Sequence, residues 1–174
     1  MKRRSFVKAS LFTTMSAAIL PQITKATEVI DKESTMFYEL REYTLKDAQQ
    51  QTLIENYFKD AAIPALKRLG IQSVGLFAEL KPEGQSKLYA LIPYKSLDEF
   101  MNVETRLFND KAYLTAAEAY LNAPASSPAY ERIESSLLKA FAHMPNLELP
   151  ERKTRIFELR RYEHATESAG KKKL

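Results

Sequence analysis

The stretch FYELREYT (residues 37–44) returns almost unchanged as IFELRRYE at residues 156–163. Residues in both copies alternate in character along the chain, which is the two-residue period of a β-strand with one face against a core. The copies lie 119 residues apart, a spacing far too long for a solenoid repeat. We therefore interpret them as the first strands of two consecutive units.

The segment between the two copies contains the other elements of one unit. The predicted elements are, in chain order, a strand over residues 37–43, a helix over 47–70, strands over 71–80 and 87–94, and helices over 96–108 and 111–123. Pro64 should kink the first helix, because proline cannot donate a backbone hydrogen bond and clashes with the preceding turn. Ser96 and Glu99 have the spacing of a capping box and predict the start of the next helix.

Residues 129–141, AYERIESSLLKAF, fit two kinds of structure. Ile133, Leu137 and Phe141 have a spacing that suits one face of a helix and also alternate positions of a strand. The pattern by itself leaves both alternatives open. A strand here would complete the order β-α-β-β-α-β, the ferredoxin-like split βαβ unit, and would make the fold class α+β.

The N-terminus has the pattern of an export signal. A basic start, MKRRSFVK, precedes about 12 small and apolar residues, which is too few to span a bilayer as a helix. Arg3 and Arg4 followed by Phe6 and Lys8 resemble a twin-arginine signal, with cleavage expected after Ala26 and the mature protein in the periplasm. An ordinary basic amphipathic N-terminus is the alternative.

The charge of the chain argues against a nucleic-acid partner. The net charge is +4, but residues 1–26 hold five of the 26 basic residues and no acid, which leaves 21 basic against 22 acidic residues. The basic surface that nucleic acids require is therefore absent from the predicted mature chain. With no cysteine and only His143 and His164, we expect neither a disulfide nor a metal site, and we expect no cofactor. Haem was the one cofactor worth weighing, and surface or capping roles suit the two histidines better.

Four stretches together closely resemble bacterial proteins of the NIPSNAP family, which belongs to the dimeric α+β barrel superfamily. They are FYELREYTLK, NYFKDAAIPALKRLGIQSVGLF, KLYALIPYKSLDEF and YERIESSLLKAF. The resemblance implies that 129–141 is a strand and that the sheet pairs with a second sheet, from another copy or domain, to enclose a barrel. The domains it implies are an export signal (1–26), a flexible arm (27–35), a NIPSNAP-like domain (36–143), a linker (144–154) and the incomplete start of a second such domain (155–174).

The candidate site follows from the first strand. We expect Tyr38 and Leu40 beneath the helices, and Glu39, Arg41 and Tyr43 facing the barrel, where an acceptor, a fixed cation and a phenol could hold a small anionic or phenolic ligand. Residues with weaker claims are Tyr94 at the pocket rim, Arg132 and Glu134 on the last strand, and Glu158, Arg160 and Tyr162 in the second copy. The alternative is that Glu39 and Arg41 only pair with each other or across an interface.

Three functions remain open at this point. The first is an exported module that dimerises through its open sheet and holds a small anionic or aromatic ligand, so that Arg41→Ala would weaken ligand retention or dimer formation. The second is a cofactor-independent oxygenase or isomerase acting on a small aromatic or quinone-like substrate, as the superfamily resemblance suggests. The third is a purely structural assembly domain. A cavity beside a free acid or base would favour the enzyme.

Overall fold

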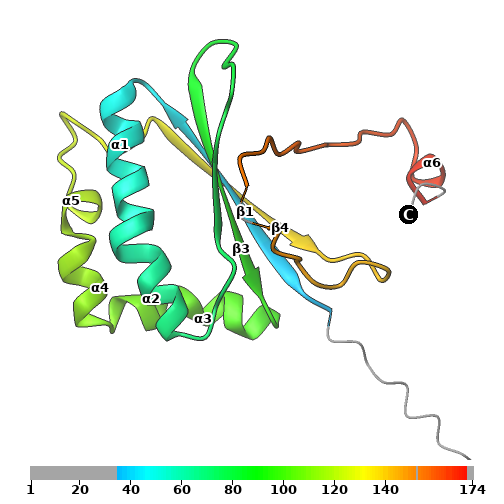
Figure 1. Cartoon of the computed structure of the whole chain (residues 1–174), viewed down its shortest axis with the longest axis horizontal. Coiled ribbons are helices and arrows are strands. Elements are labelled where there is room, and N and C mark those ends of the chain that lie inside the picture. Colours follow the sequence, from blue (N-terminus) through cyan, green and yellow to red (C-terminus); the bar gives the residue numbers. More distant parts are fainter. Residues whose placement is uncertain (1–34, 152, 172–174) are drawn as a thin grey trace, which may run out of the picture. The chain divides into compact units, whose positions relative to one another are not determined.

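The computed structural model describes residues 35–151 and 153–171 of the chain (Figure 1). The predicted export signal (1–26) and the predicted arm up to residue 34 lie outside the described residues. Within the described ranges, none of the helices combines the length and the apolar character that a bilayer crossing requires.

The elements follow one another in the predicted order. They are β1 (Phe37–Leu45), α1 (Ala48–Asn56), η1 (Tyr57–Ala62), α2 (Ile63–Arg68), β2 (Gly75–Ala78), β3 (Ser86–Tyr94), α3 (Leu97–Phe108), α4 (Lys111–Ala116), α5 (Glu118–Leu121), β4 (Arg132–Lys139) and α6 (Glu167–Lys171). The four strands form one antiparallel sheet in the order β2-β3-β1-β4. This is the ferredoxin-like α+β arrangement, as predicted.

The ambiguous segment forms a strand. β4 pairs antiparallel with β1, with Tyr43 opposite Ile133 and Glu39 opposite Leu137. The reason is topological, because β3 occupies only one edge of β1 and the other edge would otherwise keep unpaired backbone groups. β4 is therefore an outer strand of the sheet.

The helix predicted over 47–70 is divided by a π-helical turn. Asp47 caps α1 by accepting hydrogen bonds from the backbone of Gln49 and Gln50. In η1 the backbone N–H of Ile63 donates to the carbonyl of Phe58, five residues earlier. This wider turn comes immediately before Pro64 and makes room for its ring, which would clash with the preceding turn of a regular α-helix. The irregularity predicted at Pro64 thus lies in the turn before it.

The helix predicted from Ser96 also begins as expected. The Ser96 hydroxyl accepts a hydrogen bond from the Glu99 N–H at 3.1 Å, and the Glu99 carboxylate accepts one from the Lys95 N–H at 2.7 Å. The side chain of Glu99 thus reaches back one residue further than in a standard capping box. Together these bonds fix the start of α3 directly after β3.

The helices from α1 to α5 form one layer against one face of the sheet (Figure 1). The core lies between the two layers and contains residues from β1, β3 and the helices. Its fully buried large side chains are Tyr43, Leu45, Ile54, Phe58, Leu88, Ile92 and Tyr94. Burial of a side chain of this kind contributes about 1.5–3 kcal/mol, so this layer supplies much of the stability of the fold.

The second copy of the repeated stretch corrects one expectation. Residues 156–163 form no strand, and only the short helix α6 follows them. Large apolar side chains in the segment, among them Ile156 and Leu159, are exposed. The physical reason is that a strand needs a hydrogen-bonded neighbour, and the place between β3 and β4 that suits this sequence is already taken by β1. The second unit proposed from the sequence stays a prediction.

Candidate functional site

The repeated motif of β1 faces the opposite side of the sheet from the one we expected. Glu39 is 3% exposed and Tyr43 is 0% exposed, and the Tyr43 ring makes an edge contact with Phe58 in the helical layer. Alternation then places Tyr38 and Leu40 on the open face. Glu39, Arg41 and Tyr43 therefore lie beneath the helices and do not point into a barrel.

The apolar bulk of β1 explains this orientation. Phe37, Tyr43 and Leu45 share one face of the strand, and Leu45 is fully buried. Because a shift of one residue exchanges the two faces of a strand, the face with the larger apolar surface turns to the core and takes its charged members with it. Glu39 and Arg41 are tolerated there because they neutralise each other.

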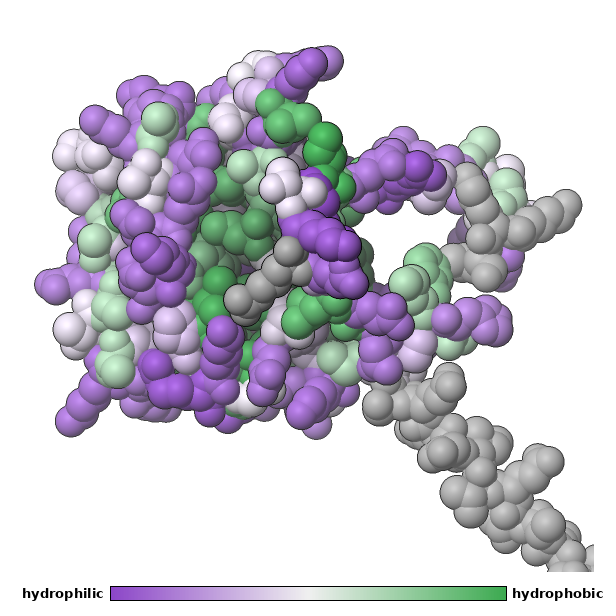
Figure 2. Space-filling view, viewed as in Figure 1, coloured by the Kyte–Doolittle hydropathy of each residue, from purple (hydrophilic) through white to green (hydrophobic). Residues whose placement is uncertain are grey.

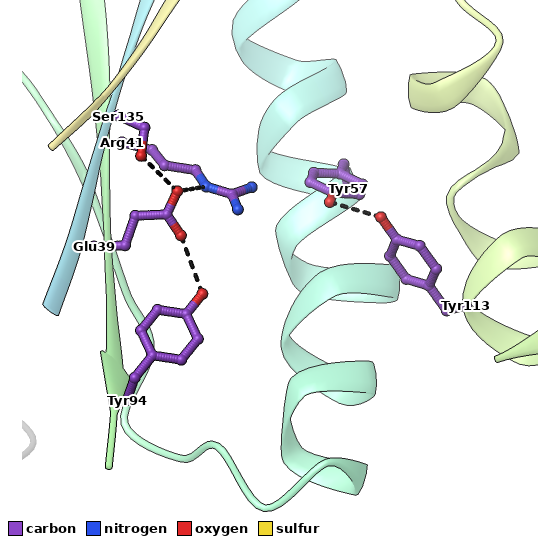
Figure 3. A network of polar contacts seen from close by, with 6 residues as sticks. All are labelled: Glu39, Arg41, Tyr57, Tyr94, Tyr113 and Ser135. Atoms are coloured by element: carbon purple, nitrogen blue, oxygen red, sulfur yellow. Dashed lines mark hydrogen bonds and ion pairs between the residues drawn. The ribbon is translucent and has the colours of Figure 1, made fainter. Parts of the chain in front are cut away.

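The Glu39 carboxylate is the centre of the buried network. It accepts hydrogen bonds from Arg41 Nε at 2.5 Å, from the Ser135 hydroxyl at 2.8 Å and from the Tyr94 hydroxyl at 3.0 Å (Figure 3). The donors come from three neighbouring strands, β1, β4 and β3, so the sheet itself sets the geometry. A buried carboxylate is costly unless it is paired and hydrogen-bonded, and this one is both.

Arg41 and Tyr94 keep one protonation state over the ordinary pH range. Burial disfavours the Arg41 cation, but the hydrogen bond and the negative charge of Glu39 outweigh this effect and raise the pKa of Arg41 above its usual value. Burial, followed by the charge of Glu39, raises the pKa of Tyr94, so its hydroxyl stays protonated and donates. The predicted site residues Glu39, Arg41 and Tyr94 are thus brought together as one ion-paired group.

A cluster of aromatic rings lies beside this network. The Tyr57 and Tyr113 hydroxyls are 3.0 Å apart (Figure 3), and the rings of Tyr57 and Tyr120 stack at 3.8 Å with an angle of 13°. The Tyr43 ring packs edge-on against Tyr130. Sequence periodicity placed Tyr57 and Tyr120 on buried helix faces, but it gave no sign that tyrosines from β1, η1, α4 and α5 would meet.

The Tyr43 hydroxyl is buried and has no hydrogen-bond partner among the described residues. Burial raises the pKa of Tyr43, and the nearby Arg41 cation lowers it in part. The hydrogen bond from Arg41 to Glu39 uses Nε, and the terminal nitrogens of Arg41 extend from the sheet towards the helical layer (Figure 3). The Tyr43 hydroxyl interacts with the Arg41 and Tyr120 side chains, so the site combines polar donors with aromatic walls.

The network adjoins a side of the sheet that the helices do not seal. Ile133 and Leu137 of β4 lie on the same face as Tyr43 and Glu39 but are 37% and 45% exposed. The Arg41 side chain, next to them on β1, is 26% exposed. Hydrophobic residues also reach the surface between the mostly polar helices and the sheet in Figure 2. Solvent or a small molecule can thus approach Arg41 across β4.

The cavities of the described chain lie elsewhere. One, of about 270 Å³, is formed by Met36, the loop at residues 70–73, the end of β3 and residues 146–147. The other, a shallow hollow of about 460 Å³, lies along α1. Neither includes Glu39, Arg41 or Tyr43.

The other weaker candidates, on β4 and in the second copy of the motif, lie outside the network. Arg132 pairs with Glu134 at 2.6 Å, and Arg160 pairs with Glu158 at 2.7 Å, in both cases between exposed side chains. Tyr162 is also exposed. The predicted pairing of glutamate with arginine thus occurs in both copies of the motif, buried in the first and exposed in the second. His143 and His164 are exposed and take no part in the site.

The sheet order and the single helical layer define a ferredoxin-like α+β protein. The sequence model of the NIPSNAP family matches residues 38–145, and the chain therefore belongs to the NIPSNAP family, as the resemblance implied. No curated protein matches the chain.

Solved structures agree on the fold. A NIPSNAP family protein from Agrobacterium tumefaciens is 18% identical, with 63% of this chain and 90% of that chain covered and a TM-score of 0.50. An uncharacterised NIPSNAP domain protein from Burkholderia xenovorans is 14% identical, with 63% and 99% covered and a TM-score of 0.50.

Proposed function

We propose that this protein is an exported module that self-associates through the open face of its sheet and holds a small aromatic ligand beside Arg41 and Tyr43. The observation that carries the proposal is the one-sided helical layer, which leaves the other face of a four-stranded sheet without a helix across it (Figure 1). The export is inferred from the sequence of residues 1–26, and the ligand from the polar donors and aromatic rings of the site around Arg41.

The open face carries a patch that favours a partner. Leu40 of β1 is directly opposite Leu91 of β3, and Tyr38 is opposite Pro93 on the same face and opposite Leu138 of β4. Leu138 is 41% exposed, while Tyr38, Leu40 and Leu91 are half-buried. Residues beyond β4 cover part of this face, since the Tyr38 hydroxyl donates to the Pro145 carbonyl at 3.4 Å and Phe157 packs against Phe77. Apolar surface on an antiparallel sheet is stabilised when another layer covers it.

The other end of the open face is charged and would orient the partner. Glu42 and Lys87 form an ion pair there, and Glu134 lies opposite Glu42 on β4. Charged groups at the margin of an apolar interface contribute more to orientation than to affinity. A second copy of the chain presents the same two halves, which suits a symmetric dimer.

The charges of the buried site select among ligands. Glu39 and Arg41 already neutralise each other, so an added anion would leave the site with a net negative charge. A neutral molecule with an acceptor oxygen needs no such compensation, because the Tyr43 hydroxyl and the terminal nitrogens of Arg41 can donate to it. Of the anionic and aromatic ligands suggested by the sequence, the site therefore favours an aromatic one with a carbonyl or phenolic oxygen, which approaches Arg41 across β4.

An oxygenase or isomerase has less support from the geometry. Such chemistry requires an acid or base that can reach the substrate. Glu39 accepts hydrogen bonds from three donors and is paired with Arg41, so it is not a free base. We therefore favour binding over catalysis.

The ligand site is tested with one neutral and one anionic probe. Calorimetry would measure the binding of menadione, a neutral naphthoquinone, and of benzoate to the full chain and to two variants, Tyr43→Phe and Tyr38→Phe. Loss of one hydrogen bond should weaken menadione binding about tenfold in Tyr43→Phe. Tyr38→Phe, on the open face, should bind as the wild type does. Equal binding in all three proteins, or binding of benzoate alone, would contradict the proposed ligand.

A further inference from the structure

We propose that the outer edge of β4 takes up residues 156–163 of a second copy of this chain as an added antiparallel strand. The inference rests on the self-association proposed above and names a surface and a segment that bring it about. It concerns the edge of the sheet, whereas the proposed function concerns the open face.

The edge of β4 is suited to receive a strand. β4 is the last strand in the sheet order, and all eight of its residues are exposed. The stretch RIESSLLK contains no proline or glycine that would interrupt pairing. Its outward backbone N–H and C=O groups have no neighbouring strand in the described structure, and such an edge is a template for another chain.

The segment 156–163 is suited to be that strand. It has the same length as β4 and repeats the sequence of β1, the strand that already pairs with the inner edge of β4. Within its own chain it forms no strand, and most of its side chains are exposed. Pairing would give its backbone the hydrogen bonds that an extended segment otherwise makes only with water.

The charges agree with a definite register. If each residue of the second copy takes the register of its counterpart in β1, Arg161 lies opposite Glu134 and Glu163 lies opposite Arg132. In β1 the counterparts are Glu42, which has the same charge as Glu134, and Thr44, which is neutral. The second copy therefore differs in charge from β1 at two positions, and at both of them its residue has the charge opposite to that of the β4 residue it would face. Each such cross-strand pair contributes about 0.2–1 kcal/mol.

The apolar positions fit the same register. Phe157 would lie opposite Leu138 on the open face, and Tyr162 would lie opposite Ile133 on the other face. Leu138 and Ile133 are both exposed large apolar residues of β4. The added strand would thus cover apolar surface on both faces of the edge.

The strand would come from a second copy, because in its own chain the start of the segment packs over the open face of the sheet beside β2. The Phe157 ring packs against Phe77 of β2, with ring centres 5.0 Å apart. β2 and β4 are the two outer strands, separated by β3 and β1. At about 4.8 Å between neighbouring strands, the two edges lie about 14 Å apart.

The geometry selects a pair of residues for cross-linking. The Ala140 N–H donates to the Met36 carbonyl at 2.9 Å, one step beyond the β1–β4 ladder and in its register. Along an antiparallel ladder, hydrogen-bonded and non-hydrogen-bonded residue pairs alternate, so Ser136, four residues before Ala140, also directs its backbone N–H and C=O towards β1. A strand added on the outer edge would therefore face Ser136 in a non-hydrogen-bonded pair. There the side chains of opposite residues approach most closely, at a separation that a disulfide can bridge. The residue opposite Ser136 would be Leu159.

The experiment mixes two single-cysteine variants of the full chain, Ser136→Cys and Leu159→Cys, under mild oxidation. The chain has no cysteine of its own, so any disulfide comes from these positions. The matched control replaces Ser136→Cys by Ser135→Cys, the same substitution at the neighbouring residue on the other face of β4. We expect a covalent heterodimer from the first mixture and at least tenfold less from the control. Charge reversal adds a second readout, since Arg161→Glu and Glu134→Arg should each weaken the association and their mixture should partly restore it.

The outcomes separate this inference from the proposed function. A chain that is dimeric by native mass spectrometry but gives no heterodimer disulfide would overturn the edge pairing and leave the open-face association standing. A monomeric chain would overturn both. Equal cross-linking of Ser135→Cys would also overturn the register, and a disulfide formed only within the double variant Ser136→Cys/Leu159→Cys would show that the strand comes from the same chain.

Discussion

Arg41 Nε lies 2.5 Å from Glu39 Oε1, and this ion pair lies beneath the helices on the buried side of β1. The two residues are next but one in the sequence, so the extended backbone directs both side chains to the same face. Because the two charges neutralise each other, β1 can be an inner strand of the sheet although its helix-facing side carries charged residues. It also leaves the donors of Arg41 and Tyr43 that we propose for the ligand.

Breaking the ion pair should cost stability. Arg41→Met leaves the Glu39 carboxylate buried without its counter-charge, and we expect the free energy of unfolding to fall by about 3 kcal/mol. Arg160→Met, in the exposed copy of the same motif, should leave it nearly unchanged. Urea unfolding followed by circular dichroism measures both, and equal effects would show that the first pair is no more buried than the second. The double variant Glu39→Gln/Arg41→Met should lose less than Arg41→Met alone.

Removal of the hydroxyl should lower the free energy of unfolding at one buried tyrosine, Tyr94, and should not lower it at another, Tyr43. Tyr94→Phe removes a donor to the Glu39 carboxylate, and we expect a loss of about 1–2 kcal/mol in the free energy of unfolding. Tyr43→Phe removes a hydroxyl that has no partner in the described structure, so stability should stay the same or rise by about 1 kcal/mol. The same urea experiment compares the two. A loss in Tyr43→Phe as large as that in Tyr94→Phe would show that the Tyr43 hydroxyl is bonded after all.

The buried tyrosines should also make the fold sensitive to alkali. Burial, followed by interaction with Glu39 for Tyr94 and with Tyr113 for Tyr57, raises the pKa of these two phenols above the ordinary value of 10.0. A group with a raised pKa in the folded state stabilises the fold below its unfolded pKa and loses this contribution as the pH rises. The free energy of unfolding should therefore decrease as the pH rises above about 10. The decrease should be smaller in Tyr94→Phe, and a flat profile would contradict the burial of these phenols.

A charge on the apolar part of the open face should prevent self-association. Leu40→Glu places a carboxylate opposite Leu91 at the centre of the proposed interface, and we expect a monomer with unchanged helix content. Leu97→Glu is the matched control, because Leu97 is an exposed leucine in the helical layer and should leave the dimer intact. Size-exclusion chromatography with light scattering gives the mass. A dimeric Leu40→Glu protein would place the interface elsewhere.

The fold could be predicted because its signals are local or topological. The strands around Arg41 and Tyr89 have recognisable patterns, and Ser96 marks a helix start that the structure confirms. Residues 129–141 could not be assigned from periodicity, and the β4 strand was settled by the need to pair the free edge of β1. The structure of residues 1–34, including the predicted signal, lies outside the described residues.

The orientation of the site could not be predicted from the motif alone. Glu39 and Arg41 suggested a polar face, while the apolar residue that decides the matter, Leu45, lies just beyond the predicted strand over 37–43. Extending the strand by two residues would have shown Phe37, Tyr43 and Leu45 on one face. The missing partner of the Tyr43 hydroxyl depends on where η1 and α5 pack, and no sequence pattern reports that.

The most direct test of the account is native mass spectrometry of the mature protein purified from its own cell envelope. We predict twice the mass of the mature chain, with an added small molecule that disappears in Tyr43→Phe. The mass of a single chain with nothing bound would contradict both the self-association and the ligand site.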